Sequence, residues 1–154
     1  MIPNATLTLI LDGGIDFVND DIRVGLLDNS ISYSEDPDTH ETVADITDGV
    51  TAAEYSDTNY GRVQLGGQAT TTDDSNDRSI FDANDASFSN LGSSNGDTIQ
   101  AVFIYRHNGT DDSNNELLRV VNDQDSSDLP LATNGETVTI EWDGTDGIAT
   151  LATN

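Results

Sequence analysis

The sequence contains no cysteine and no lysine, and each absence excludes a kind of chemistry. Without cysteine the chain forms neither disulfides nor thiolate metal sites. Five arginines stand against 29 Asp and Glu residues, which gives a formal net charge of -24 at pH 7. Proteins bind nucleic acids and anionic lipids mainly through Lys and Arg. We therefore expect neither a nucleic-acid partner nor a membrane partner.

Targeting and catalytic motifs are also missing from the sequence. The opening residues, MIPNATLTLILDGG, have no basic stretch and meet Asp12 early, so we expect neither a signal peptide nor a membrane span. There is no nucleophile motif, phosphate-binding glycine loop or zinc-ligand spacing. His40 and His107 lie in polar segments that we expect to be exposed, and no Ser or Cys partner can be named for His40. The sequence predicts a protein that is not an enzyme.

The excess of acidic residues predicts a salty environment. Low apolar content with high net charge is typical of disordered chains. Here, however, the apolar residues form short β-rich runs between turn residues, which predicts a folded chain. At molar salt the Debye length is about 3 Å, so surface carboxylates repel one another much less. We interpret the composition as halophilic, the alternative being an ordinary acidic protein.

The apolar runs predict a single all-β domain over residues 1–154, with little helix. Turn signals recur at about 8–12 residues, which is typical of an antiparallel β-sandwich, here of jelly-roll or immunoglobulin-like character. The clearest feature is a hairpin over Thr98–Val121, whose continuous apolar arm Ile99–Tyr105 predicts a strand buried on both faces. The strands are expected at 22–27, 53–55, 62–65, 68–72, 78–81, 86–88, 99–105, 117–121, 137–142 and 148–151.

Two segments outside these strands are less regular. Over Thr6–Leu11 the alternation of Leu with Thr slightly favours a strand over a helix. The segment Asp28–Asp48 is rich in Asp and Ser and contains Pro37, which predicts a long loop with one helical turn near Thr42–Ile46. Long loops in compact domains are usually functional, so this loop is a candidate interaction segment.

Three groups of acidic residues offer oxygen ligands for a cation such as Ca²⁺. None follows the calcium-loop pattern with its glycine and bidentate glutamate, and the alternative is a solvated loop that attracts diffuse Na⁺ or K⁺. We therefore expect no cofactor beyond weakly bound cations. The candidate ligands are Asp73, Asp74 and Asp77, then Asp123, Asp125 and Asp128, and in the long loop Asp36, Asp38 and Glu41.

Four stretches carry a resemblance to a known family. They are DFVNDDIRVGLLDNSISYSEDPDTHETVADI, NDRSIFDANDASFSNLG, AVFIYRHNGTDDSNNELLRVV and TVTIEWDGTDGIATL. In order and spacing they resemble small virion structural proteins of tailed viruses of bacteria and archaea, of the type that infects haloarchaea. The resemblance implies a structural role in the particle and a helical N-terminal segment. It also implies lysine at the positions of Arg23 and Arg106, from which this chain departs.

From these observations we predict a virion protein that decorates the outside of a capsid. Its partners would be further copies of itself, the major capsid protein or tail proteins, and the host surface. A tail or baseplate protein that attaches to the host is the alternative, and a secreted carbohydrate-binding module is a weaker one, which would need an exposed aromatic patch. The residues expected to contact partners are Asp36, Asp38, His40, Glu41, His107, Asp111 and Asp112.

Overall fold

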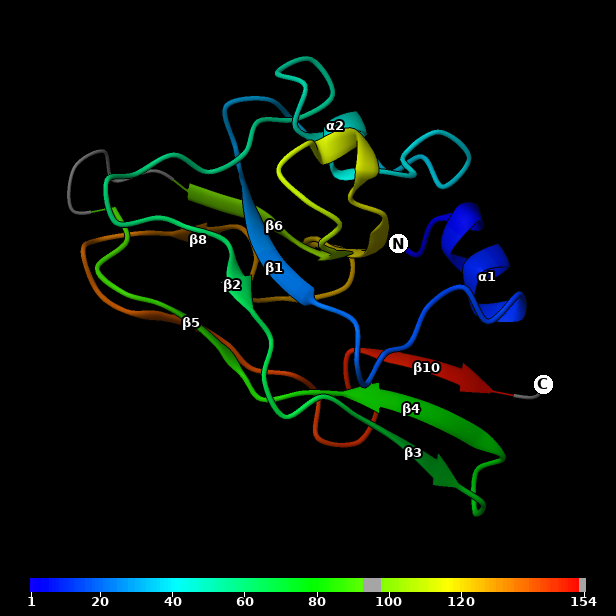
Figure 1. Ribbon diagram of the computed structural model, residues 1–154. Helices are drawn as coiled ribbons and strands as arrows, with labels where there is room; N and C mark the ends of the chain where they lie inside the picture. The colour runs from blue at the N-terminus through cyan, green and yellow to red at the C-terminus, as the bar shows by residue number, and fades with distance from the viewer. Residues whose placement is uncertain (93–97, 153–154) are drawn as a thin grey trace.

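The computed structural model describes residues 1–92 and 98–152, and it confirms an all-β, antiparallel, sandwich-like fold with little helix (Figure 1). Nearly every predicted strand is present, although residues 53–55 contribute only one isolated bridge and β8 was not predicted. The strands are β1 (Ile22–Asp28), β2 (Val63–Gln64), β3 (Ala69–Asp73), β4 (Arg78–Asp82), β5 (Ala86–Phe88), β6 (Thr98–Arg106), β7 (Leu117–Val121), β8 (Leu131–Ala132), β9 (Val138–Ile140) and β10 (Ala149–Ala152). The helical segments are α1 (Asn4–Leu11), α2 (Val43–Ile46) and the 3-10 turn η1 (Asp112–Asn114).

The central sheet has the strand order β2-β1-β6-β7, and β8 pairs with the beginning of β6. β1 and β6 pair along their whole lengths, from Ile22 opposite Arg106 to Asp28 opposite Ile99, with one irregularity after Leu27. Five consecutive residues of β6, from Ala101 to Tyr105, are buried. The prediction that this strand is buried on both faces is therefore confirmed.

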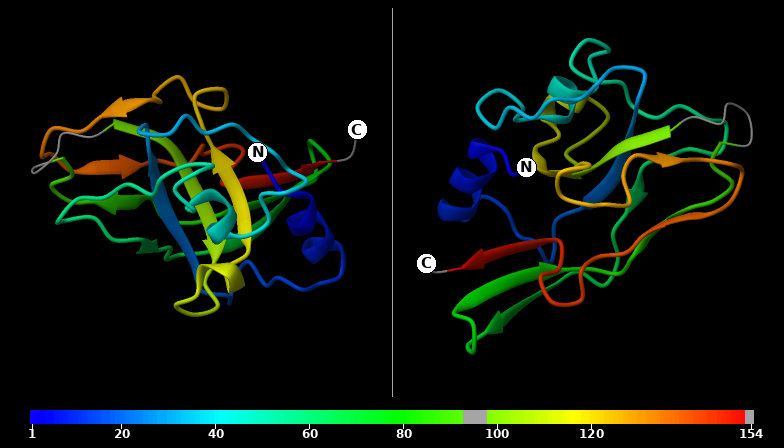
Figure 2. Two further views of the ribbon diagram at one scale, coloured as in Figure 1. Left: turned by 90° about the horizontal axis from the view of Figure 1, so that it is seen from above. Right: turned by 180° about the vertical axis from the view of Figure 1, so that it is seen from behind.

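Each face of the central sheet has its own hydrophobic core. One face is covered by the smaller sheets β10-β4-β3 and β5-β9, and the other by α2 and the loops near it (Figure 2). A large apolar side chain contributes about 1.5–3 kcal/mol when fully buried, so the doubly covered strands contribute most to stability. The first core includes Ile22, Val24, Leu26, Phe81, Phe88, Ile99, Ile104 and Ile148, and the second Leu27, Val43, Ile46, Phe103, Tyr105, Leu117 and Val120.

A glycine in β1 allows a close contact on the second core's face. Gly25 lies opposite Phe103 in the sheet, and a Cβ added to Gly25 would lie 2.1 Å from the Cζ atom of that ring. The aromatic ring therefore occupies the volume that any other residue would need. On the same face, Arg62 places its guanidinium 5.5 Å from the ring centroid of Phe103 and 5.3 Å from that of Tyr105, a cation–π geometry.

The N-terminal segment is a helix, so the strand that local alternation favoured over Thr6–Leu11 is wrong, and the helix implied by the resemblance is present. Tertiary contacts override the local preference here. In a helix Thr6 and Ile10 fall on one face, where both line a small cavity above the first core, and the Thr6 hydroxyl donates to the Leu117 carbonyl. The predicted helical turn near Thr42–Ile46 is confirmed as α2, which begins with a capping box between Thr42 and Asp45.

Candidate interaction surfaces

The expectation that His40 is exposed is wrong, because its side chain is only 7% exposed. The Asp36 backbone N–H donates to its Nδ1 atom at 3.3 Å, and the Tyr33 hydroxyl lies 3.2 Å from the same nitrogen. A neutral His40 that accepts from Asp36 must carry its proton on Nε2. Burial also raises the pKa of Tyr33. His40 thus helps to fix the loop, and it offers no exposed contact to a partner.

The acidic side chains around His40 lie nearer the surface. Asp38 and Glu41 are exposed, and Asp36 is half-buried. One Asp38 oxygen accepts a hydrogen bond from the Asn4 side chain at 2.5 Å, which links the long loop to the start of α1. Because the two exposed carboxylates sit on a fixed loop, they remain candidate contact residues.

The tip between β6 and β7 is more firmly held than a free contact loop would be. Arg62 donates two hydrogen bonds to Asp112, at 2.6 and 2.7 Å, and two more to Glu54, both at 2.7 Å. Hydrogen bonding from Arg62 lowers the pKa of Asp112, despite the opposing effect of burial. Asn115, at 1% exposure, is buried beneath the tip. Only part of the tip therefore faces solvent.

The other two tip residues differ in exposure. Asp111 is exposed and accepts hydrogen bonds from the backbone and hydroxyl of Ser113 at 3.0 and 2.7 Å. His107, which was also expected to be exposed, is half-buried with its ring nearly perpendicular to that of Tyr105, and its backbone N–H donates to the Asp21 carbonyl. Of the residues predicted to contact partners at the tip, Asp111 remains the best placed.

The structure does not bring the candidate cation ligands together. Within residues 1–92 and 98–152, no three acidic or histidine side chains converge as a metal site. Asp73 accepts hydrogen bonds from Asn76 at 2.7 Å and from Arg78 at 2.9 Å, and Asp125 lies 3.3 Å from the nitrogen of Met1. Internal donors therefore occupy one member of each of these two groups. The remaining members, Asp74, Asp77, Asp123 and Asp128, are exposed.

Four of the five arginines form ion pairs with described carboxylates, which neutralises little of the surface charge. The pKa of Asp21 is lowered by its hydrogen bond to Arg23, as the pKa of Asp112 is by Arg62. The exception is Arg119, which donates to the Ile148 carbonyl and forms no ion pair within the described part of the chain. The four pairs are Arg23 with Asp21, Arg62 with Glu54 and Asp112, Arg78 with Asp73 and Asp146, and Arg106 with Asp20 and Glu116.

Besides the acidic loops, the edge strand β3 offers a surface for association. We call its residues Ala69–Thr72 the open edge. All four residues are exposed, and in the described residues β3 pairs only with β4. Residues 63–72 contain no charged residue and no proline. In Figure 1 β3 lies on the outer side of its sheet, at the end of the molecule opposite α2. A strand edge of this kind has backbone donors and acceptors available for pairing.

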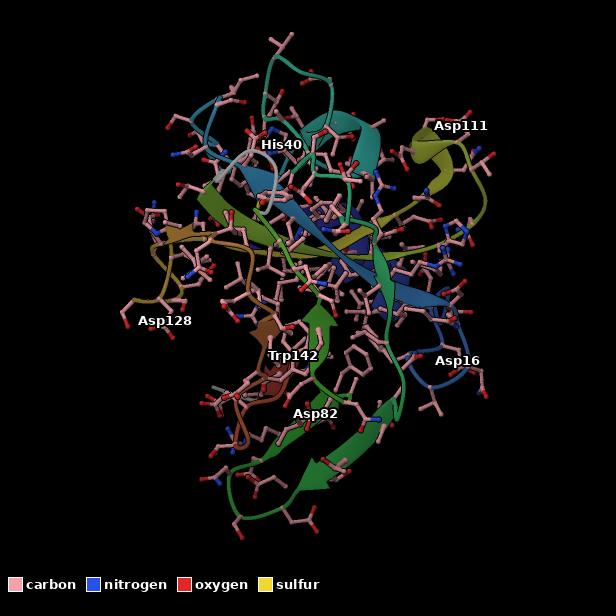
Figure 3. All side chains as sticks on the ribbon, turned by 90° about the vertical axis from the view of Figure 1, so that its left-hand side faces the viewer. Asp16, His40, Asp82, Asp111, Asp128 and Trp142 are labelled. Carbon is pink, nitrogen blue, oxygen red and sulfur yellow. The ribbon has the colours of Figure 1, made fainter. Side chains whose placement is uncertain are left out.

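The predicted surface residues lie at several separate places. In Figure 3 Asp111 and Asp128 lie on opposite sides of the molecule, so the acidic loops form no single site. Among the aromatic residues, Phe81, Phe103 and Tyr105 are buried, whereas Trp142 is half-buried and lines a groove.

Comparisons with known protein families, with curated proteins and with solved structures find no match to this chain. None of the helices in the described residues has the length and apolar character needed to cross a membrane.

Sequence reasoning missed the residues that organise these surfaces. Arg62 lies 50 positions from Asp112, so their ion pair has no local signal in the sequence. Gly25, in the middle of an apolar run, was a usable signal, since a glycine inside a strand often marks the close approach of another group. The strand over 68–72 was predicted, but its exposure on both faces was not.

Proposed function

We propose that the chain is a structural protein of a virus particle, which decorates the outside of the capsid of a tailed virus from a hypersaline habitat. The observation that carries the proposal is the open edge, an unblocked strand in a chain whose net charge is -24. The resemblance to virion structural proteins supports the same assignment. The acidic surface favours the outside of the particle, because it would repel packaged DNA.

The open edge is suited to pairing with a second copy of the same chain. Soluble proteins usually protect such edges with charged residues, proline or bulges. β3 has none of these between Ala69 and Thr72, and its register with β4 is continuous. Antiparallel pairing of two β3 strands would place threonines opposite threonines, a favourable cross-strand combination, and would bring no charges together. A two-fold symmetric dimer with a continuous six-stranded sheet would result.

A direct test is to purify particles of the virus that encodes the chain and to examine them by mass spectrometry and immuno-electron microscopy. We expect the protein in the particles and label distributed over the capsid. Label at the tail tip alone would replace this proposal with the tail or baseplate alternative. Absence of the protein from particles would contradict both.

The halophilic part of the proposal has its own test. We expect the melting temperature, followed by circular dichroism, to fall by about 5 °C or more between molar and low salt, which corresponds to about 2 kcal/mol for a domain of this size. The physical reason is unscreened repulsion among 29 acidic residues. An unchanged melting temperature would contradict a halophilic origin.

A further inference from the structure

A groove of about 280 Å³ lies between the end of β7, β9 and the loop that joins β7 to β8. Its volume is near the lower limit of small-molecule sites, roughly 300 Å³, so it has room for one small ring. Half of its lining side chains are apolar and half are polar or charged, and Trp142 and Arg119 both line it. The apolar lining residues are Val102, Val121, Leu129, Leu131, Val138 and Ile140.

Trp142 lines this groove two residues after the end of β9. Its indole Nε1–H donates to the Asn84 carbonyl at 3.1 Å, and its backbone N–H donates to Asp85 at 3.2 Å. These two contacts fix the ring against the segment before β5. Because the ring is half-buried, part of it remains accessible.

The charged groups of the groove fall into two kinds. One oxygen of Asp125 lies beside the Met1 nitrogen, and one oxygen of Asp143 accepts from the backbone of its own turn at 2.7 and 2.8 Å. Asp128 and Glu141 are exposed and line the groove as acceptors. Arg119, which forms no ion pair with any described carboxylate, supplies donors.

This combination favours a neutral, hydroxyl-rich ligand. An anion would be repelled, because the carboxylates that line the groove outnumber Arg119. Hydroxyl groups can donate to Asp128 and Glu141 and accept from Arg119, while the C–H face of a sugar ring covers apolar surface and the indole. Such contacts are hydrogen-bonded and apolar, so molar salt weakens them less than a charge pair.

We propose that this groove binds a neutral hexose unit of a glycan. The inference goes beyond the assignment as a virion protein and does not depend on it, because it rests only on the groove's apolar lining, Trp142, Arg119, Asp128 and Glu141. It also differs from the open edge, which would bind a second copy of the chain.

The chain contains a single tryptophan, so its fluorescence reports directly from the groove. The experiment titrates the full chain in molar salt with glucose, galactose and mannose, and separately with sodium sulfate. We expect a saturable fluorescence change with at least one hexose, at a dissociation constant on the order of 1 mM for a ligand of one ring. Sulfate should cause no saturable change. The proposal would be overturned if only sulfate changed the fluorescence, or if none of the three sugars changed it.

Two variants test the assigned contacts. Glu141→Gln and Arg119→Met should each weaken hexose binding about tenfold or more, because each removes a hydrogen bond to a charged group. Glu136→Gln is the matched control, since it removes one charge from an exposed residue that does not line the groove. Glu141 is itself exposed, so its substitution should leave the circular dichroism spectrum unchanged. If both groove variants bound the hexose as tightly as the parent chain does, the proposed site would be contradicted.

Discussion

The central sheet and the sheet β10-β4-β3 are both antiparallel, but their strands differ in burial. β6 is buried on both faces, whereas β3 is exposed along Ala69–Thr72. The residues reflect the difference, since β6 is a continuous run of apolar and aromatic side chains and β3 is mostly threonine. Both compositions favour strands, but only the first can form a core. The central sheet therefore contributes most of the buried strand residues, whereas the outer sheet keeps an exposed edge strand.

Gly25→Ala should have the largest effect, because it tests how tightly the central sheet is packed. The added Cβ would lie 2.1 Å from the Phe103 ring, which would have to move inside a filled core. We expect a loss of about 3 kcal/mol in the free energy of unfolding, measured by urea denaturation in molar salt. Gly61→Ala is the control, since a Cβ there meets nothing within 4 Å, and it should change stability by less than about 0.5 kcal/mol.

A second substitution can check the cause of that loss. Combining Gly25→Ala with Phe103→Leu removes the ring that causes the clash, so the two substitutions should be less destabilising together than the sum of their separate effects. Strict additivity of the two effects would show that the clash is not the reason.

Arg62→Met should have the next largest effect, because Arg62 joins the central sheet to the acidic tip. The substitution removes the ion pairs with Glu54 and Asp112 and the contacts with two aromatic rings. We expect a loss of about 2 kcal/mol and faster amide hydrogen exchange over residues 107–115. Arg23→Met, which removes one partly exposed pair, should cost less than about 0.5 kcal/mol. Equal losses would contradict a special role for Arg62.

The ion pair between Arg62 and Asp112 should make the stability of the fold depend on pH. The pKa of Asp112 is lowered in the folded protein by the hydrogen bond from Arg62. The carboxylate therefore stabilises the fold above its unfolded pKa of about 3.9, and this contribution is lost as pH falls through the lowered value. After discounting for solvent screening we expect about 1 kcal/mol. Urea denaturation between pH 6 and pH 2 should show this loss in the parent chain and a smaller one in Asp112→Asn, and identical pH profiles would refute it.

Thr71→Glu should change stability least while altering association. Thr71 is exposed on the open edge, so the substitution should reduce the free energy of unfolding by less than about 1 kcal/mol. In an antiparallel β3 pair it would place like charges close together, which should convert a dimer to a monomer in analytical ultracentrifugation at molar salt. Ser75→Glu adds the same charge at the exposed hairpin tip outside β3 and should leave the dimer intact. A parent chain that sediments as a monomer would contradict the proposed pairing.

The fold was largely predictable because its strands have local signals. Ile99–Tyr105 is a continuous apolar run, and Val138–Ile140 alternates, so both strands follow from periodicity. The N-terminal helix was not predictable from alternation. It depends on the contacts of Thr6 and Ile10 with a core that distant strands form. His40 was misjudged for a similar reason, since polar neighbours in sequence say nothing about the Tyr33 ring that lies against it.

The surfaces were less predictable than the fold. Acidic loops were correctly placed outside the strands, but the sequence does not show which carboxylates an arginine already holds. Asp112 and Asp73 are engaged in this way, whereas Asp111 is not bound by an arginine in the described residues. The groove beside Trp142 combines residues from β7, β9 and two loops, so only the folded chain brings them together.

The pairing of β1 with β6 also sets when this chain can fold. Ile22 pairs with Arg106, so the first core strand has no neighbour of its full length until two thirds of the chain has been synthesised. Contacts between such distant residues must first overcome the entropy of closing a long loop, which slows folding. The outer sheet is completed later still, because its strand β10 comes from the last residues described. We therefore expect refolding on the millisecond-to-second scale, in which β10 joins β4 last, whereas the open edge pairs with β4 in a local hairpin.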